Sequence, residues 1–340
     1  MNKAARGVMT DPQVTHRIRT ATGVDNADAG LTAEHPVKAT PKRRWFRYSL
    51  RTLLVLTLVL GCGLGWFARQ VQRARAQREA VEAIEKQGGR VAQQRSGGVI
   101  RTAVAWLGRL VGEDLSWDVR IVQLSGTPVS DAGLARVRGL TQLLRIELDN
   151  TRVTDAGLAH LRGLTQLQGL DLANTQISDA GLEHLRGLTQ LQGLFLKNTQ
   201  VTDAGLDHLR GLTQLRSLDL SSTQVTDAGL EHLRGLTSLG YLNLRSTLVT
   251  DEGLSHLRDL APLVALDLDN TRITDAGLVH LEALKPLTTL RLNNTPITDV
   301  GLAHLRELTE LKMLYLYGTK VTDAGVKELK KALPNVWINH

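Results

Sequence analysis

The chain repeats one short tract at a fixed interval of 24 residues. The tract reads (Thr/Ser)-Asp-x-Gly-(Leu/Val), and its aspartate stands at Asp131, Asp155, Asp179, Asp203, Asp227, Asp251, Asp275, Asp299 and Asp323. No insertion or deletion interrupts the interval. A constant period of this length is typical of solenoid proteins, in which each repeat packs on its neighbours alone. We therefore expect residues 119–340 to form one array of nine repeats with a C-terminal cap.

Each repeat follows the plan of residues 167–190, which predicts a strand, a turn and a helix. The opening L-x-x-L-x-L pattern alternates, as in a short half-buried strand. Thr175 then begins a turn, and Ser178 stands beside Asp179 where a helix N-cap belongs. The buried face of the helix is expected to carry Leu182, Leu185 and Leu188.

This plan resembles the leucine-rich repeat, whose consensus is L-x-x-L-x-L-x-x-N/C-x-L. The resemblance covers about two thirds of the chain. It implies an α/β solenoid, a horseshoe with a parallel sheet on the concave side and helices on the convex side. Its helix entry, (I/V)-(S/T)-D-x-G-L-x-x-L, is similar to the long-helix repeats of F-box partner proteins, although no F-box-like segment precedes it.

Threonine stands where the consensus has asparagine in all nine repeats, at Thr127, Thr151, Thr175, Thr199, Thr223, Thr247, Thr271, Thr295 and Thr319. A hydroxyl can bond backbone groups in the turn, with fewer bonds than an amide. We therefore expect the turn to keep its backbone hydrogen bond despite the substitution.

Positive charge is concentrated before the array. Residues 1–118 hold 19 Lys and Arg against 10 Asp and Glu, whereas residues 119–340 hold 22 against 24. A nucleic-acid reader needs basic charge clustered on its binding face, and the repeats lack that excess. The basic residues flank an apolar segment instead, which favours a membrane and no nucleic acid.

The apolar segment, residues 52–68 (TLLVLTLVLGCGLGWFA), carries no charge. Its 17 residues span roughly 26 Å as a helix, near the ~30 Å of a bilayer core. Aromatic residues suited to the membrane interfaces stand on both sides: Trp45, Phe46, Tyr48, Trp66 and Phe67. A buried globular helix and a cleaved signal peptide are the alternatives, and some 50 preceding residues disfavour the signal peptide. We expect residues 41–68 to hold a basic flank and one transmembrane helix.

The basic flanks also predict the orientation. Six residues precede the segment and four follow it: Lys38, Lys42, Arg43, Arg44, Arg47 and Arg51 against Arg69, Arg73, Arg75 and Arg78. The positive-inside rule places the N-terminus in the cytoplasm and the repeats outside it, on the periplasmic side.

Cys62 is the single cysteine, so the chain can form no intrachain disulfide. Its tract resembles a lipoprotein cleavage box only loosely, which favours a plain membrane residue over a lipidated one.

The remaining N-terminal segments are expected to connect the membrane to the array. Residues 1–40 lack apolar periodicity, which predicts a disordered tail. Residues 69–100 are expected to form a helical stalk that ends at Gly88-Gly89, followed by a linker. Residues 101–118 contain an amphipathic stretch, RTAVAWLGRLV, which we interpret as a cap helix over the first repeat.

Three N-terminal motifs occur in a fixed order: RRWFRYSLRTLLVL, QRARAQREAVEAIEKQGGRV and WLGRLVGEDL. Together with the repeats they resemble a family of membrane-anchored leucine-rich-repeat proteins from planctomycete-type bacteria. That resemblance implies a cell-envelope protein without a known reaction.

Two repeated residue types could carry chemistry. The histidines, five residues after the aspartate, are His160, His184, His208, His232, His256, His280 and His304. As metal ligands they would be too far apart, because neighbouring helices lie roughly 8–10 Å from each other. Calcium binding by the aspartates would require a glycine-rich nonapeptide that the repeats lack. We interpret the histidines as cover for the rim of the core, the aspartates as helix caps and the following glycine as a close-packing site. We expect no metal and no cofactor.

No catalytic motif is present: the sequence has no GxSxG elbow, phosphate-binding glycine loop or HExxH. A ligand would instead meet the variable strand residues on the concave face. The central row is expected to be Gln123, Glu147, Asp171, Phe195, Asp219, Asn243, Asp267, Arg291 and Tyr315. The next row contributes Asp149, Lys197, Arg245, Asp269 and Tyr317, and Tyr241 and Met313 lie one strand position from the centre.

Aromatic residues of the array fall on these variable positions, and mixed aromatic and charged surfaces favour protein interfaces. The candidate partner-binding residues are Phe195, Tyr241, Arg291, Met313, Tyr315 and Tyr317, with Asp171, Asp219 and Asp267 as secondary candidates. Two other interpretations are open: strands tolerate aromatic residues, and the last aromatics can belong to a closing cap. In that cap, residues 336–338 are expected to begin an incomplete tenth strand.

We therefore expect a non-catalytic, membrane-anchored protein that binds another protein, or an envelope component, on its concave face. The alternatives are a structural protein that associates with its own copies and, more remotely, an unrecognised enzyme. The sequence does not identify the partner.

Overall fold

The computed structural model describes residues 49–95, 112, 115, 117–260 and 262–340. It divides into two units, Met1–Leu54 and Val55–His340, of which the first is described only over its last six residues. The tail expected over residues 1–40 and the cap helix expected over residues 101–111 lie outside the described residues.

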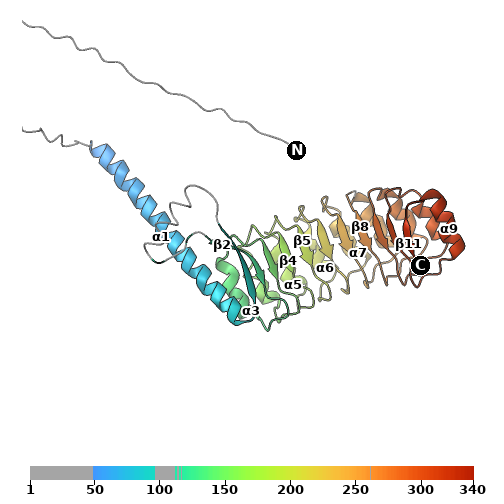
Figure 1. The fold of residues 1–340 in the computed structure, drawn as a ribbon, viewed down its shortest axis with the longest axis horizontal. Helices are drawn as coiled ribbons and strands as arrows, with labels where there is room; N and C mark the ends of the chain where they lie inside the picture. The colour runs from blue at the N-terminus through green and yellow to red at the C-terminus, as the bar shows by residue number, and fades with distance from the viewer. Residues whose placement is uncertain (1–48, 96–111, 113–114, 116, 261) are drawn as a thin grey trace, which may run out of the picture. The chain divides into compact units, whose positions relative to one another are not determined.

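One sheet runs through the second unit, and its strands follow each other in chain order (Figure 1). The strands are β1 (Arg90–Arg95), β2 (Trp117–Gln123), β3 (Arg145–Glu147), β4 (Gly169–Asp171), β5 (Gly193–Phe195), β6 (Ser217–Asp219), β7 (Tyr241–Asn243), β8 (Ala265–Asp267), β9 (Thr289–Arg291), β10 (Met313–Tyr315) and β11 (Trp337–Asn339). Strand β1 is antiparallel to β2, and every later pair is parallel. The fold is an open parallel solenoid, and β11 confirms the expected closing strand.

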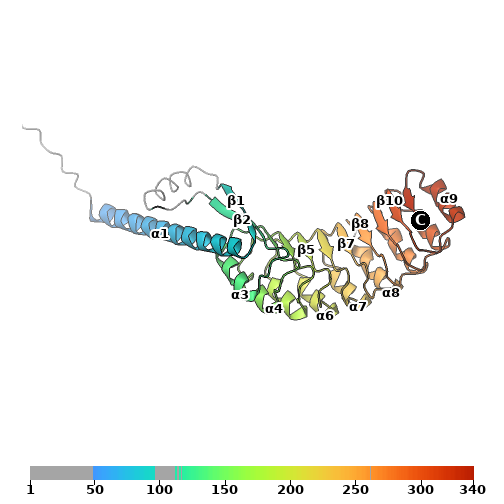
Figure 2. The same cartoon turned by 60° about the horizontal axis from the view of Figure 1, so that its bottom comes forward.

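The opposite side of the array consists of short helical turns, as the second view shows (Figure 2). Its α-helices are α3 (Asp131–Leu134), α4 (Asp155–Leu158), α5 (Asp179–Leu182), α6 (Asp203–Leu206), α7 (Asp227–Leu230), α8 (Asp251–Leu254) and α9 (Asp323–Ala332). The 3₁₀ helices are η1 (Ala135–Gly139), η2 (Glu183–Leu185), η3 (Asp207–Leu209), η4 (Glu231–Leu233), η5 (Ser255–Asp259), η6 (Gly277–Ala283) and η7 (Gly301–Leu305).

These turns correct the expected similarity to long-helix repeats. In the repeats from Asp131 to Leu254 the α-helical part is four residues long, the next two repeats have only the 3₁₀ helices η6 and η7, and the closing helix α9 has ten residues. A coil of 24 residues must also contain the strand, the turn and the return loop, which leaves room for about two helical turns.

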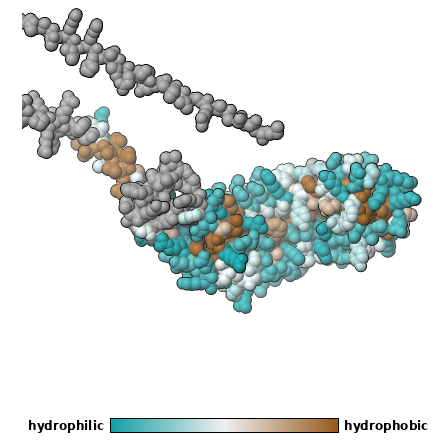
Figure 3. Space-filling view, in the orientation of Figure 1, coloured by the Kyte–Doolittle hydropathy of each residue, from teal (hydrophilic) through white to brown (hydrophobic). Residues whose placement is uncertain are grey.

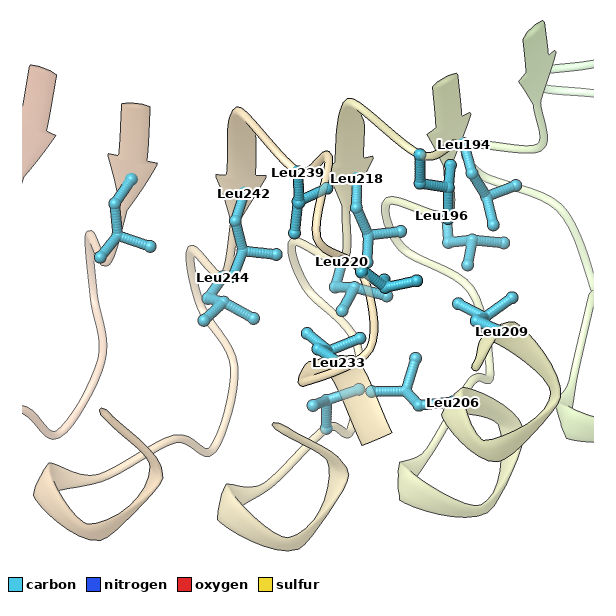
Figure 4. Packing of buried hydrophobic residues seen from close by; sticks show 14 of the residues in the cluster. Leu194, Leu196, Leu206, Leu209, Leu218, Leu220, Leu233, Leu239, Leu242 and Leu244 are labelled. Atoms are coloured by element: carbon cyan, nitrogen blue, oxygen red, sulfur yellow. The ribbon is translucent and has the colours of Figure 1, made fainter. Parts of the chain in front are cut away.

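The core is a continuous column of leucine between the sheet and the helical turns. Leu194 and Leu196 of the strand side and Leu206 and Leu209 of the helical side lie in the layer between them, beside the leucines of the neighbouring coil (Figure 4). All four are fully buried. Burial of one such side chain contributes about 1.5–3 kcal/mol. Because the repeats have identical spacing, every coil places its leucines at the same positions, and together they form the core.

The turn after each strand has a conserved geometry within the chain. The residue before the threonine has a positive φ, near 55° at Asn174 and 57° at Ser222. The threonine hydroxyl donates to the carbonyl of the leucine three residues earlier, as in the 2.6 Å bond from Thr175 to Leu172. This bond confirms that threonine serves the turn in place of the consensus asparagine.

The repeat aspartates join neighbouring coils. Asp155 Oδ1 accepts a 2.8 Å hydrogen bond from the Ser178 backbone N–H, and Asp155 Oδ2 accepts a 2.5 Å bond from the Ser178 hydroxyl. The same pair of bonds recurs from Asp131 through Asp299, and we call this set the aspartate ladder. Helix capping was therefore the wrong role within the repeats, where the Ser178 hydroxyl donates to the preceding coil and caps no helix, but it was right at the closing helix α9, where the Thr322 side chain accepts from the Gly325 N–H.

The repeat glycine makes room for the ladder. A Cβ at Gly181 would collide with Asp155 Oδ1 and lie 3.2 Å from its Cγ. The same collision is built in at Gly205, Gly229 and Gly253. Glycine thus permits close packing of successive coils, as expected, and its specific neighbour is the ladder carboxylate.

Helix α1 (Leu50–Lys86) covers the first coil with its C-terminal end. Ala80 and Ile84 are buried in the common core cluster, and the helix ends before Gly88, whose φ is +85°. Residues 90–95, expected to be linker, instead form β1 and pair with β2. The unpaired edge of β2 explains the difference, because it offers backbone donors and acceptors that a passing chain can satisfy.

Among the described residues, α1 is the one helix whose length and apolar composition would allow it to cross a membrane. None of the apolar window of α1 is buried, and Leu53, Leu58 and Leu60 are each more than half exposed.

Candidate functional site

The expected central row of the concave face is confirmed by the strand register. Gln123, Glu147, Asp171, Phe195, Asp219, Asn243, Asp267, Arg291 and Tyr315 pair in sequence across β2 to β10. Tyr241 and Met313 belong to a second row, which lies two residues before the central row on each strand. Ala265 and Thr289 stand between them in that row. Apolar surface appears over the first strands and again toward the C-terminal end (Figure 3).

At the C-terminal end, three side chains of consecutive strands stack on each other. The Arg291 guanidinium lies 4.4 Å from the centroid of the Tyr315 ring, as in a cation–π contact. The Tyr315 ring meets Trp337 edge to face at 5.4 Å. Arg291 Nε also lies 4.0 Å from Asp267 Oδ2, so the cluster has an acidic neighbour. We call Arg291, Met313, Tyr315, Tyr317 and Trp337 the aromatic cluster.

The aromatic cluster reaches the closing strand β11 through Trp337, against which the Tyr315 ring packs, but it remains partly exposed. The cap core consists of Leu329, Leu333 and Val336, which are buried. Tyr317 is 67% exposed and Trp337 53% exposed, so neither ring is consumed by cap packing. From the sequence, Trp337 was predicted only as part of the closing strand. Its position opposite Met313 could have identified it as a further member of the aromatic cluster.

Between the two ends, the central row is acidic and partly engaged in its own turns. Asp171, Asp219 and Asp267 each accept a bond from the backbone N–H two residues later, at 2.8–3.0 Å. Burial raises the pKa of Asp171 and of Asp267 above the ordinary value of 3.8. Burial, followed by the Asp219 and Asp267 charges, raises the pKa of Tyr241. The second oxygen is also engaged in two of them: Asp219 Oδ2 accepts a 3.2 Å bond from the Asn243 amide, and Asp267 Oδ2 lies 4.0 Å from Arg291 Nε.

A hollow in the sheet surface over β1 to β6 was not anticipated. Gly169 and Gly193 occupy the same row on neighbouring strands, and Phe195 stands beside them. The space measures about 470 Å³. Its lining consists of Gln94, Arg120, Ile121, Leu144, Arg145, Gln168, Gly169, Gln192, Gly193, Phe195, Arg216 and Ser217. The signal in the sequence was the pair of glycines 24 residues apart inside strands, where the other repeats carry side chains.

With this geometry in place, comparison with known proteins gives the class of the repeats. The family model described as Leucine Rich repeat matches residues 211–233 and 283–308. The array is a leucine-rich-repeat solenoid. No curated protein matches the chain. A crystal structure of internalin C2 from Listeria monocytogenes is similar at 29% identity, with 60% of this chain and 81% of that chain covered and a TM-score of 0.49.

On the helical side of the leucine-rich-repeat array, four of the histidines contact an arginine of the preceding coil. His184 Nδ1 lies 2.6 Å from Arg162 Nη2, and His280 Nδ1 lies 2.6 Å from Arg258 Nη2. Equivalent contacts join Arg186 to His208 and Arg210 to His232, and we call these four pairs the arginine–histidine series. Within the described residues no group of three or more His, Cys, Asp or Glu side chains could hold a metal ion.

Proposed function

We propose that the protein is a non-catalytic, membrane-anchored leucine-rich-repeat protein that binds another protein on its concave face. The observation that carries this proposal is the aromatic cluster. Aromatic, methionine and arginine side chains are the types enriched in the centres of protein interfaces. Here they are presented on consecutive rigid strands at half-buried or exposed positions.

The physical state of the cluster fits binding better than folding. Tyr317 bonds the preceding coil through its backbone: its N–H donates to Asn293 Oδ1 at 2.8 Å and its carbonyl accepts from the Asn294 N–H at 2.7 Å, while its ring remains largely exposed. Met313 is 40% exposed on the same face. Burial of these apolar groups by a partner would be favourable, at roughly 25 cal/mol per Å².

Membrane anchoring is the second part of the proposal. The exposed apolar window of α1 would be costly in water over this length and is satisfied in a bilayer. The excess of basic residues before the segment supports a cytoplasmic N-terminus and repeats on the periplasmic side of a cell envelope. The three N-terminal motifs support the same arrangement through their resemblance to membrane-anchored planctomycete-type proteins.

The proposal is tested by partner capture with the full-length chain from membrane extracts, followed by identification of captured proteins. We expect the double variant Tyr315→Ala, Tyr317→Ala to fold normally and lose the partner. The matched control is Val279→Ala, Val300→Ala, which removes exposed apolar groups from the helical side. Capture that is unaffected by the tyrosine variant would remove the aromatic cluster from the proposed interface.

A structural role through self-association is the alternative, and the same chain distinguishes it. Light scattering of the detergent-solubilised protein should report a monomer if the concave face serves a different protein. A stable oligomer that dissociates in the tyrosine variant would instead assign this face to a second copy.

A further inference from the structure

The backbone does not require the hollow over Gly169 and Gly193, although a Cβ at Gly169 would lie 3.2 Å from Cγ of the Arg145 side chain. Neither glycine has a positive φ, so the backbone does not require glycine at either position. A Cβ at Gly193 would meet only the Phe195 ring, at 3.4 Å, which is ordinary van der Waals contact. Glycine inside a strand weakens it and often marks the close approach of a ligand.

Arginine surrounds the hollow on the side where the strands begin. Arg120, Arg145 and Arg216 line it, and no carboxylate is among its described lining residues. Arg145 Nε is engaged by Glu147 at 3.0 Å. Arg120 Nη2 lies 3.9 Å from Asp118 Oδ2, and its buried Nε has no hydrogen-bond partner. Within the described part of the chain Arg216 forms no ion pair, so its guanidinium has donors left for an anionic group.

Negative charge borders the hollow on its other side. In the central row, Phe195 pairs with Asp171 on one strand and with Asp219 on the next. A ligand with dense negative charge in all directions, such as a polyphosphate or an anionic bilayer surface, would be repelled by these two carboxylates. A ligand with a single carboxylate next to an apolar side chain can place the carboxylate at the arginines and keep negative charge away from Asp171 and Asp219.

We propose that this hollow binds an acidic segment of a protein partner, with a Leu- or Phe-type side chain over Gly169 and Gly193 and a Glu or Asp carboxylate at Arg216. This inference rests on the proposed function and assigns a chemistry to one part of the concave face. The volume of about 470 Å³ accommodates one large apolar side chain with its neighbouring carboxylate. Phe195 forms the wall against which the apolar group packs.

The experiment uses the full-length chain in phosphatidylcholine nanodiscs and synthetic peptides that combine Glu or Asp with Leu or Phe. Each peptide has a counterpart with Gln or Asn in place of the acid. We expect the acidic peptides to bind about tenfold more tightly than their amide counterparts, with a dependence on salt concentration. Equal binding of the two sets would overturn the assignment, as would a preference for phosphopeptides or for vesicles of anionic lipid.

Two variants locate the binding in the hollow. Gly193→Val fills the space with a residue suited to strands, and we expect it to weaken the acidic peptides about tenfold. Ala265→Val, in the same row three strands away, is the matched control and should bind as the native chain does. Should Gly193→Val fail to fold by circular dichroism, Gly193→Ala and Arg216→Gln are measured in its place. Unchanged binding in these folded variants would refute the site.

The two proposals fail separately. Loss of the captured partner in the Tyr315→Ala, Tyr317→Ala variant, with no effect of Gly193→Val on any peptide, would refute the hollow and leave the concave interface intact. Peptide binding that depends on Gly193 but not on the tyrosines would support the hollow and move the interface toward the first repeats.

Discussion

The aspartate ladder gives the most direct prediction about stability, through Asp203→Ala in the middle of the array. Asp203 accepts a 2.8 Å bond from the Thr226 backbone N–H and a 2.6 Å bond from the Thr226 hydroxyl. Hydrogen bonds to a charged acceptor each contribute about 1.5–3 kcal/mol. Asp203 is half-buried, so water replaces part of the loss, and we expect the free energy of unfolding to fall by about 3 kcal/mol.

The assay is guanidinium chloride unfolding of the detergent-solubilised chain, followed by circular dichroism. Asp299→Ala is the matched control because Asp299 makes the same two bonds to Thr322, at 2.8 and 2.7 Å, in an exposed setting. We expect it to cost less than half as much as Asp203→Ala, since solvent reaches its partners. Equal losses at the two sites, or a central loss under about 1 kcal/mol, would refute the argument that the half-buried part of the ladder joins the coils.

A double-mutant cycle isolates the steric side of the same contact. A Cβ at Gly229 would collide with Asp203 Oδ1, so Gly229→Ala should be destabilising by itself. In the Asp203→Ala background the colliding oxygen is absent, and the added cost of Gly229→Ala should largely disappear. Simple additivity would show that the glycine serves another purpose.

Further predictions concern acid stability and topology. Burial, followed by the Arg162 charge, lowers the pKa of His184 below its ordinary 6.5. The unfolded chain therefore takes up the proton first, and stability present above pH 6.5 is lost as the pH falls below that value. His280 behaves alike beside Arg258, so His184→Gln, His280→Gln should flatten the decline of unfolding free energy in acid, and an unchanged decline would contradict this. Protease added to intact spheroplasts should remove the repeats, whereas full protection would reverse the proposed orientation.

The period of the sequence predicted the order of strands and the rows of the concave face because side chains in a strand alternate and every coil has the same length. The pairing of Phe195 with Asp171 and Asp219 follows from counting 24 residues in either direction. Roles that depend on the neighbouring coil were harder to predict. Ser178 looked like a helix cap in its own repeat, and its actual acceptor, Asp155, is 23 residues away.

The N-terminal boundary of the sheet was also predicted less well, because it depends on a contact with a neighbouring strand. Residues 90–95 have no strong strand pattern, and they form β1 because the edge of β2 is available for pairing. The signal for a strand there is the unpaired edge, which exists only in the assembled array.

By itself, the sequence determined the solenoid, its leucine core and the face on which variable residues gather, because a fixed period combined with alternation leaves one way to bury the leucines. Only the tertiary structure decided what the repeated polar residues do and where the concave face is hollow. Stacking the coils about 4.8 Å apart brings each aspartate against the next coil's threonine or serine and sets Gly169 beside Gly193. Those contacts join residues from different coils, and a pattern read within one repeat does not contain them.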